Sequence, residues 1–257
     1  MATVKAVSSR DNPLLGRLRK LVADPAGYRK HGEVWLEGEH LCQAWLQRGG
    51  AVPQALITEA AWESAPLRAL AQRAEAVALI PERLMKGLGT LESAAPLAFV
   101  VPWAAVTAPE ARLASVVLDR LQDAGNVGTI LRSAAAFGFG QVLALKGTAA
   151  LWSPKVLRAG MGAHFGLRLV EGLNEDALDG MDVPMLATSS HATAAIDEIE
   201  LPWPCAWVLG HEGQGVAPGL QARCAQALRI PQPGGEESLN VAAAAAVCLY
   251  ESVRQRR

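Results

Sequence analysis

The sequence predicts an α/β protein of two domains, the larger of which is built on a parallel β-sheet. Short apolar runs alternate with helical patterns along the chain, and this alternation is typical of α/β folds. In the second half the apolar runs are continuous, as expected of strands buried on both faces of a parallel sheet. Two prolines and several small residues at 102–112 (PWAAVTAPEAR) mark a linker between the halves.

The N-terminal half predicts a small α/β domain over residues 31–103, after a basic arm at 1–30 and before a linker at 104–112. The stretch EVWLEGEHLCQAWLQRGG (33–50) is typical of a short strand followed by an amphipathic helix. Further strands are predicted within 53–62, 76–81 and 96–102, and further helices at 64–74 and 82–88.

The C-terminal domain, residues 113–257, continues the alternation. Strands are predicted at 114–121, 141–147, 167–171, 183–190, 205–212 and 227–231. Helices are predicted at 127–137, 153–160, a short piece at 194–198, and 238–254. Ser238 is expected to be the N-cap of the last helix, whose alanine run has high helix propensity.

Composition narrows the class of protein. A chain of 257 residues with 51% hydrophobic and 19% charged residues indicates a compact soluble protein. Its longest apolar stretch, 238–250, is shorter than the roughly 20 residues of a membrane span, and the N-terminus has no signal-peptide core. The four cysteines are scattered without metal-ligand spacing. We therefore expect a cytoplasmic protein with reduced cysteines and no metal.

The formal net charge of −1 conceals two local excesses of positive charge. Residues 1–30 contain two aspartates and seven basic residues, namely Lys5, Arg10, Arg17, Arg19, Lys20, Arg29 and Lys30. The segment 124–170 has no Asp or Glu and five basic residues, namely Arg132, Lys146, Lys155, Arg158 and Arg168. Because local charge sets the attraction to phosphates, this distribution favours a nucleic-acid partner.

Four predicted strands of the second half end in small or polar residues, in the loops QDAGNVG (122–128), ATSSH (187–191), GHEGQG (210–215) and PQPGGEESLN (231–240). Ligands bind beyond the carboxyl ends of the strands in open α/β sheets, so these loops predict one site. A dinucleotide is disfavoured, because the acidic residue expected about 20 positions after a glycine-rich turn is missing and the next carboxylate is Glu171. Phosphate-loop and nucleophile-elbow motifs are also missing.

Three segments together resemble, in order and spacing, the motifs of the SpoU (TrmH-type) RNA ribose methyltransferases of the SPOUT superfamily. They are LDRLQDAGNVGTILRSAAAFG (118–138), WVLGHEGQGV (207–216) and IPQPGGEESLNVAAAAAVCLYE (230–251). The N-terminal half is more loosely similar to the substrate-binding module of that family. Two departures are Gln-Asp-Ala-Gly in place of Asp-Pro-Gly before Asn126, and His211 where a small residue is common. Neither affects a residue assigned to chemistry.

The resemblance implies methyl transfer from S-adenosylmethionine to a ribose 2′-hydroxyl of RNA, with ribosomal RNA favoured over transfer RNA. It also implies a trefoil knot in the C-terminal domain and a homodimer. The cofactor is expected to contact Gly210, Ile230 and Leu239, with Thr188 and Gly215 beside it. Without the resemblance, core packing would be the favoured interpretation of Ile230 and Leu239.

The same resemblance assigns five residues to catalysis: Asn126, Arg132, Glu212, Ser238 and Asn240. Asn126 and Arg132, expected near the start of a helix, would orient the substrate and its phosphates. A guanidinium keeps its proton, so Arg132 is not expected to act as the base. Glu212 either accepts the hydroxyl proton or pins the glycine-rich loop through backbone N–H groups. Ser238 and Asn240 complete the group, and Ser238 is also a candidate helix cap.

The sequence leaves two alternatives open. One is a non-catalytic RNA-binding or ribosome-assembly protein with the same fold, which the presence of all five residues disfavours. The other is a methyltransferase that acts on transfer RNA. The sequence does not predict which nucleotide is modified.

Overall fold

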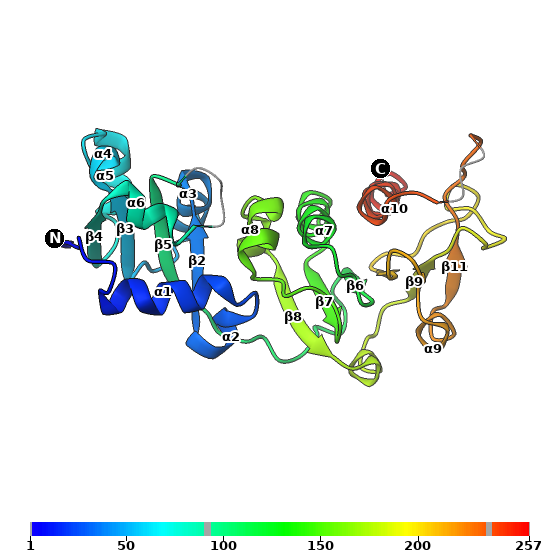
Figure 1. Cartoon of the computed structure of the whole chain (residues 1–257). Coiled ribbons are helices and arrows are strands. Elements are labelled where there is room, and N and C mark those ends of the chain that lie inside the picture. Colours follow the sequence, from blue (N-terminus) through cyan, green and yellow to red (C-terminus); the bar gives the residue numbers. More distant parts are fainter. Residues whose placement is uncertain (1, 90–93, 235–237, 257) are drawn as a thin grey trace. The chain divides into compact units, whose positions relative to one another are not determined.

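The computed structural model describes residues 2–89, 94–234 and 238–256, and the contacts of the chain divide it into two units (Figure 1). Unit 1 contains Met1–Ala105 together with Trp152–Phe165, and unit 2 contains Val106–Leu151 and Gly166–Arg257. The segment Trp152–Phe165 is thus flanked in sequence by unit 2 while its contacts are with unit 1.

Unit 1 is built on a five-stranded mixed sheet of order β1-β4-β3-β5-β2. Its strands are β1 (Thr3–Ala6), β2 (Glu33–Glu37), β3 (Gln54–Thr58), β4 (Ala76–Ile80) and β5 (Leu97–Pro102). The sheet is parallel except for β5, which is antiparallel to both β2 and β3. The strands predicted between residues 33 and 102 are therefore present.

Most helices of unit 1 lie between its strands along the chain, whereas α8 comes from the segment 152–165. The helices are α1 (Pro13–Ala23), α2 (Gly27–His31), α3 (Glu39–Gln47), α4 (Glu59–Trp62), α5 (Ala65–Ala71), α6 (Glu82–Lys86) and α8 (Pro154–Gly160). Helix α1 begins because the Asn12 side chain accepts the N–H of Leu14 and Pro13 occupies the first helical position. Residues 3–31, for which the sequence predicted only a basic arm, thus form β1, α1 and α2.

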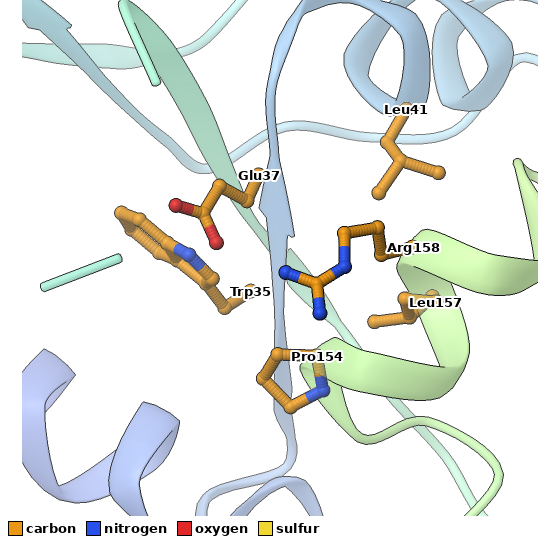
Figure 2. A pocket seen from close by; sticks show the side chains of 6 residues that line it. All are labelled: Trp35, Glu37, Leu41, Pro154, Leu157 and Arg158. Atoms are coloured by element: carbon orange, nitrogen blue, oxygen red, sulfur yellow. The ribbon is translucent and has the colours of Figure 1, made fainter. Parts of the chain in front are cut away.

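A small cavity of about 60 Å³ lies in unit 1 beside β2 (Figure 2). Its lining comes from β2, α3 and α8, namely Trp35, Glu37, Leu41, Pro154, Leu157 and Arg158. Figure 2 shows the Arg158 guanidinium extending from α8 toward β2. The lining includes none of the residues predicted to bind cofactor or substrate.

Unit 2 is built on a six-stranded sheet of order β11-β9-β10-β6-β7-β8, in which neighbouring strands are parallel. The strands are β6 (Ser115–Leu118), β7 (Gln141–Leu145), β8 (Arg168–Leu173), β9 (Met185–Thr188), β10 (Ala206–Leu209) and β11 (Gln226–Leu228). Every residue of β6, β7 and β10 is buried, which explains why all of them except Ser115 and Gln141 are apolar. The predicted α/β fold with a parallel sheet is confirmed; its trefoil knot stays a prediction.

The helices of unit 2 are α7 (Ala124–Ala136), α9 (Pro218–Gln221) and α10 (Val241–Arg254), with a 3₁₀ turn at Glu175–Leu178 and another, Ala163–Gly166, at the junction with unit 1. Helices α7 and α10 pack side by side (Figure 1). A hydrogen bond joins α10 to the sheet, because the buried Trp207 of β10 donates through Nε1 to Ser252 Oγ of α10 at 2.8 Å.

Three expectations about helices are wrong. No helix forms at 194–198, because Ala195 bridges to Arg229 and the segment continues as turns. The last helix begins at Val241, and its N-cap is Asn240 instead of Ser238. The helix predicted at 127–137 is α7, which begins at Ala124, three residues before its predicted start. Side chains decide both starts, since each cap oxygen accepts N–H groups that the first turn leaves unpaired.

Across the described ranges, no helix is both long and apolar enough to span a bilayer. In the same residues, no group of three or more His, Cys, Asp or Glu side chains is arranged to hold a metal ion.

Candidate active site

The carboxyl ends of four neighbouring strands of unit 2 lie at the same level of the sheet. Leu118 of β6 is paired with Leu209 of β10, and Thr188 of β9 is paired with Leu228 of β11. Between them, Val208 of β10 is paired with Ala187 of β9. Because the strands are parallel, the chain leaves all four at one edge, and the loops predicted to form the site all start there.

At this edge the side chains of Asn126, Glu212 and Asn240 form one hydrogen-bonded cluster. Asn126 Nδ2 donates to Glu212 Oε1 at 3.3 Å, and Asn240 Nδ2 donates to Asn126 Oδ1 at 3.0 Å. One residue comes from each of the three sequence motifs. The structure therefore brings together three of the five predicted catalytic residues.

Both asparagines are oriented by this cluster and by helix ends. Asn240 Oδ1 accepts the N–H groups of Ala242 and Ala243 at 2.9 and 3.3 Å, which leaves Nδ2 to reach Asn126. Asn126 lies in the first turn of α7 and does not cap it, because the cap is Asp123, whose Oδ1 accepts the Asn126 N–H at 2.7 Å. An amide has two N–H donors and two acceptor lone pairs, and among the described residues the Asn126 side chain uses one of each within the cluster.

The Glu212 carboxylate lies against the N-terminus of α7. It accepts the backbone N–H groups of Asp123 at 3.3 Å and Gln122 at 3.5 Å. Partial burial acts to raise the pKa of Glu212, but hydrogen bonds from its own N–H, from Asn126 and from these two N–H groups outweigh it and lower the pKa. Glu212 is therefore an ionised carboxylate at neutral pH, with its oxygens directed at donors.

The residues predicted to bind cofactor follow the strand ends. Thr188 ends β9 and donates through Oγ1 to the Val208 carbonyl at 3.3 Å. Gly210 follows β10, where a Cβ atom would lie 2.1 Å from Gly215 C and Val216 N. Ile230 follows β11 and is half-buried.

Two further predicted cofactor residues have conformations or exposure that suit contact with a ligand. Gly215 closes the loop at φ 69°, a left-handed conformation that side chains disfavour, and its N–H donates to the His211 carbonyl at 2.8 Å. Leu239 is 41% exposed, although it is a large apolar residue.

Arg132 and Ser238 are not joined to the cluster by any hydrogen bond or ion pair within the described part of the chain. Arg132 is exposed in the third turn of α7, about 9 Å along the helix axis from Asn126 and not on the same face. Its expected place near the helix start is wrong, because α7 begins before Asn126. Ser238 is exposed, two residues before the α10 cap.

Gln232 is a candidate that the sequence analysis missed. It follows β11 by four residues, and its Oε1 is buried without a hydrogen-bond partner among the described residues. Buried acceptors are rarely left unpaired, so this atom suits a donor from a ligand. Only the position of Gln232 in a strand-end loop hinted at such a role in the sequence.

Comparison with known proteins identifies the family of this chain. The model of the SpoU rRNA Methylase family matches residues 114–250. An uncharacterised tRNA/rRNA methyltransferase of Synechocystis is 33% identical over 98% of this chain and 95% of that protein. The 23S rRNA (guanosine(2553)-2′-O)-methyltransferase RlmP of Bacillus subtilis is 31% identical over 84% of this chain and 86% of its own.

The fold is also found among solved structures. The SpoU methyltransferase AviRb from Streptomyces viridochromogenes, in complex with AdoMet, has a TM-score of 0.85, covers 95% of this chain and 98% of its own, and is 24% identical. The chain thus belongs to the SpoU rRNA methylase family, as its motifs predicted.

Proposed function

We propose that this protein transfers a methyl group from S-adenosylmethionine to a ribose 2′-hydroxyl of RNA. The observation that carries the proposal is the Asn126–Glu212–Asn240 cluster, which joins the three family motifs at the carboxyl edge of the unit 2 sheet. The names of RlmP and of the other 23S rRNA methyltransferases among the relatives support ribosomal RNA as the substrate.

The residues present fit the cofactor. Gln232 offers a buried acceptor without a partner among the described residues, and S-adenosylmethionine carries N–H donors on its adenine and its ammonium group. Ile230 and the exposed Leu239 supply apolar surface for an adenine ring. The structure of AviRb with AdoMet shows this fold with the same cofactor. When bound, the cofactor supplies a methyl group on a sulfonium centre.

In this proposal the amide of Asn126 orients the ribose. The second N–H and second lone pair of this amide, which have no partner among the described residues, would hold the hydroxyl, while Glu212 and Asn240 fix the plane of the amide. Holding the attacking oxygen in line contributes most, because positioning can lower a barrier by roughly 7–11 kcal/mol.

The other three predicted catalytic residues that need an assignment are Glu212, Arg132 and Ser238. The hydrogen bonds that lower the pKa of Glu212 make it a weak base, so we assign it to positioning and not to proton removal. Arg132 is exposed and is assigned to an RNA phosphate, and Ser238 to the substrate side of the 231–240 loop.

Several wider assignments belong to the same proposal. Unit 1, with its basic α1, would bind folded RNA through phosphates and 2′-hydroxyls. The protein would work as a homodimer through α10, whose Val247 and Tyr250 are 39% and 53% exposed. A ribosomal RNA substrate would place it in the cytoplasm.

The test uses the purified full chain with S-adenosylmethionine labelled on its methyl group. Label is expected to enter ribosomal RNA at a 2′-O position, as mapped by resistance to alkaline cleavage. Calorimetric titration with S-adenosylmethionine is expected to give heat. RNA binding without either signal would instead support the non-catalytic alternative, and label confined to transfer RNA would change the substrate.

A further inference from the structure

The carboxylate of Asp119 is a buried charge at the end of β6, outside the set of residues assigned above. Its side chain is 2% exposed, and its backbone N–H continues the ladder to the Leu209 carbonyl. Arg120 donates to it twice, through Nε at 2.7 Å and Nη2 at 3.1 Å. The Ala217 N–H donates to Asp119 Oδ2 at 2.7 Å.

This pairing of adjacent residues needs an unusual backbone. Successive side chains of an extended strand point to opposite faces, so Arg120 would normally point away from Asp119. Instead, Arg120 has φ 59°, a left-handed value that is uncommon outside glycine. Such conformations are energetically unfavourable for most side chains, and they cluster at active sites and ligand clamps.

The guanidinium also reaches the loop that carries Glu212. Arg120 Nη1 donates to Gln214 Oε1 at 3.2 Å. With the Asp119 contact to Ala217, the 210–217 segment is therefore held from β6 at two points. The N–H groups of Gln122 and Asp123 also donate to Glu212, so the 210–217 segment is attached at a third point to the chain that follows β6.

We propose that Asp119 and Arg120 are positioning residues that hold the 210–217 loop in its ligand-binding conformation. The inference rests on the proposed function, because that loop carries Gly210, Gly215 and Glu212. An exposed ion pair would contribute little, but a buried carboxylate that loses its partner is destabilised, and the loop would move to rehydrate it. The pair thus couples the end of β6 to the site without touching substrate.

Arg120→Asn is the sharpest test, because Asn tolerates the left-handed backbone but lacks the guanidinium. Hydrogen exchange in the unliganded protein is expected to rise about tenfold or more for the amides of 210–217, with those of β7 unchanged. The dissociation constant of S-adenosylmethionine, measured by calorimetry, is expected to rise about tenfold, equal to about 1.4 kcal/mol.

Two more variants complete the design. Gln214→Ala removes only the second attachment of Arg120, so it is expected to weaken cofactor binding by a smaller factor even if Arg120→Asn does not fold. Asp182→Asn breaks the exposed Arg112–Asp182 pair of the same unit and is the matched control, expected to change neither measurement.

Unchanged exchange of the loop amides in Arg120→Asn and Gln214→Ala would overturn the inference, whatever the cofactor does. A lower melting temperature with wild-type cofactor affinity in the folded variants would show a merely structural role and would also overturn it. If the wild-type chain itself binds no S-adenosylmethionine, the proposed function fails, and the exchange measurement still decides the role of the pair.

Discussion

Asn240 Nδ2 donates a hydrogen bond of 3.0 Å to Asn126 Oδ1 and so links the N-terminal ends of α10 and α7, which are 114 positions apart in the sequence. The same Asn240 caps α10 through its Oδ1. One side chain therefore starts a helix with its acceptor and orients a site residue with its donor. The two roles are separable by substitution.

Asn240→Ala is expected to destabilise the protein by about 1 kcal/mol, since both the cap and the link are lost. Asn240→Asp keeps an acceptor for the cap but has no donor for Asn126. It is expected to unfold at nearly the wild-type urea concentration and to methylate RNA much more slowly. Full activity of Asn240→Asp would mean that the link to Asn126 is dispensable.

Glu212→Gln tests the charge at the start of α7. The pKa of Glu212 is lowered in the folded protein, so its ionised form adds stability above the unfolded value of about 4.3, and this stability is lost as the pH falls through the lowered value. The stability difference between wild type and Glu212→Gln is thus expected at pH 7 and should vanish in acid. Urea titrations at several pH values measure it, and a difference that grows in acid would contradict the assignment.

Gly210→Ala is expected to disrupt the loop, because its Cβ would lie 2.1 Å from backbone atoms of Gly215 and Val216. Gly213→Ala is the control in the same loop, where the nearest atoms, on the His211 ring, are 3.9 Å away. Calorimetry with S-adenosylmethionine should show loss of binding for the first variant and near-wild-type binding for the second. Equal affinities would show that the loop adapts.

Gln232→Met tests the buried acceptor. Removing a buried polar atom that has no partner among the described residues is expected to stabilise the unliganded protein by about 1–3 kcal/mol, and the variant should bind S-adenosylmethionine more weakly. Thermal melts with and without cofactor measure both effects. An unchanged cofactor-induced shift in melting temperature would remove Gln232 from the cofactor site.

Arg132→Lys is expected to leave stability and cofactor affinity unchanged, because Arg132 is exposed and makes no ion pair within the described residues. Its kcat/KM for RNA should fall, since lysine lacks the bidentate fork for phosphate. Steady-state kinetics with the RNA substrate measure this. Near-wild-type turnover would refute bidentate phosphate binding.

Much of the fold could be predicted because local patterns carry it. Strands β6, β7 and β10 are buried on both faces, so they appear in the sequence as runs that are apolar except for the first residues of β6 and β7. Helix starts could not be placed in the same way. Asp123 and Asn240 cap α7 and α10, yet Ser238 and Asn126 were equally suitable residue types, and only the path of the chain distinguishes them.

The α/β class, the parallel sheet and the family could all be predicted from burial patterns and glycine-rich motifs, because these run along the chain. Which motif residues meet depends on how the chain folds in space. The tertiary structure joined Asn126, Glu212 and Asn240, left Arg132 and Ser238 outside that cluster, and directed the Glu212 oxygens at the start of α7. Hydrogen bonds depend on atoms within about 3.5 Å, and the register of neighbouring strands sets those distances, which no local pattern encodes.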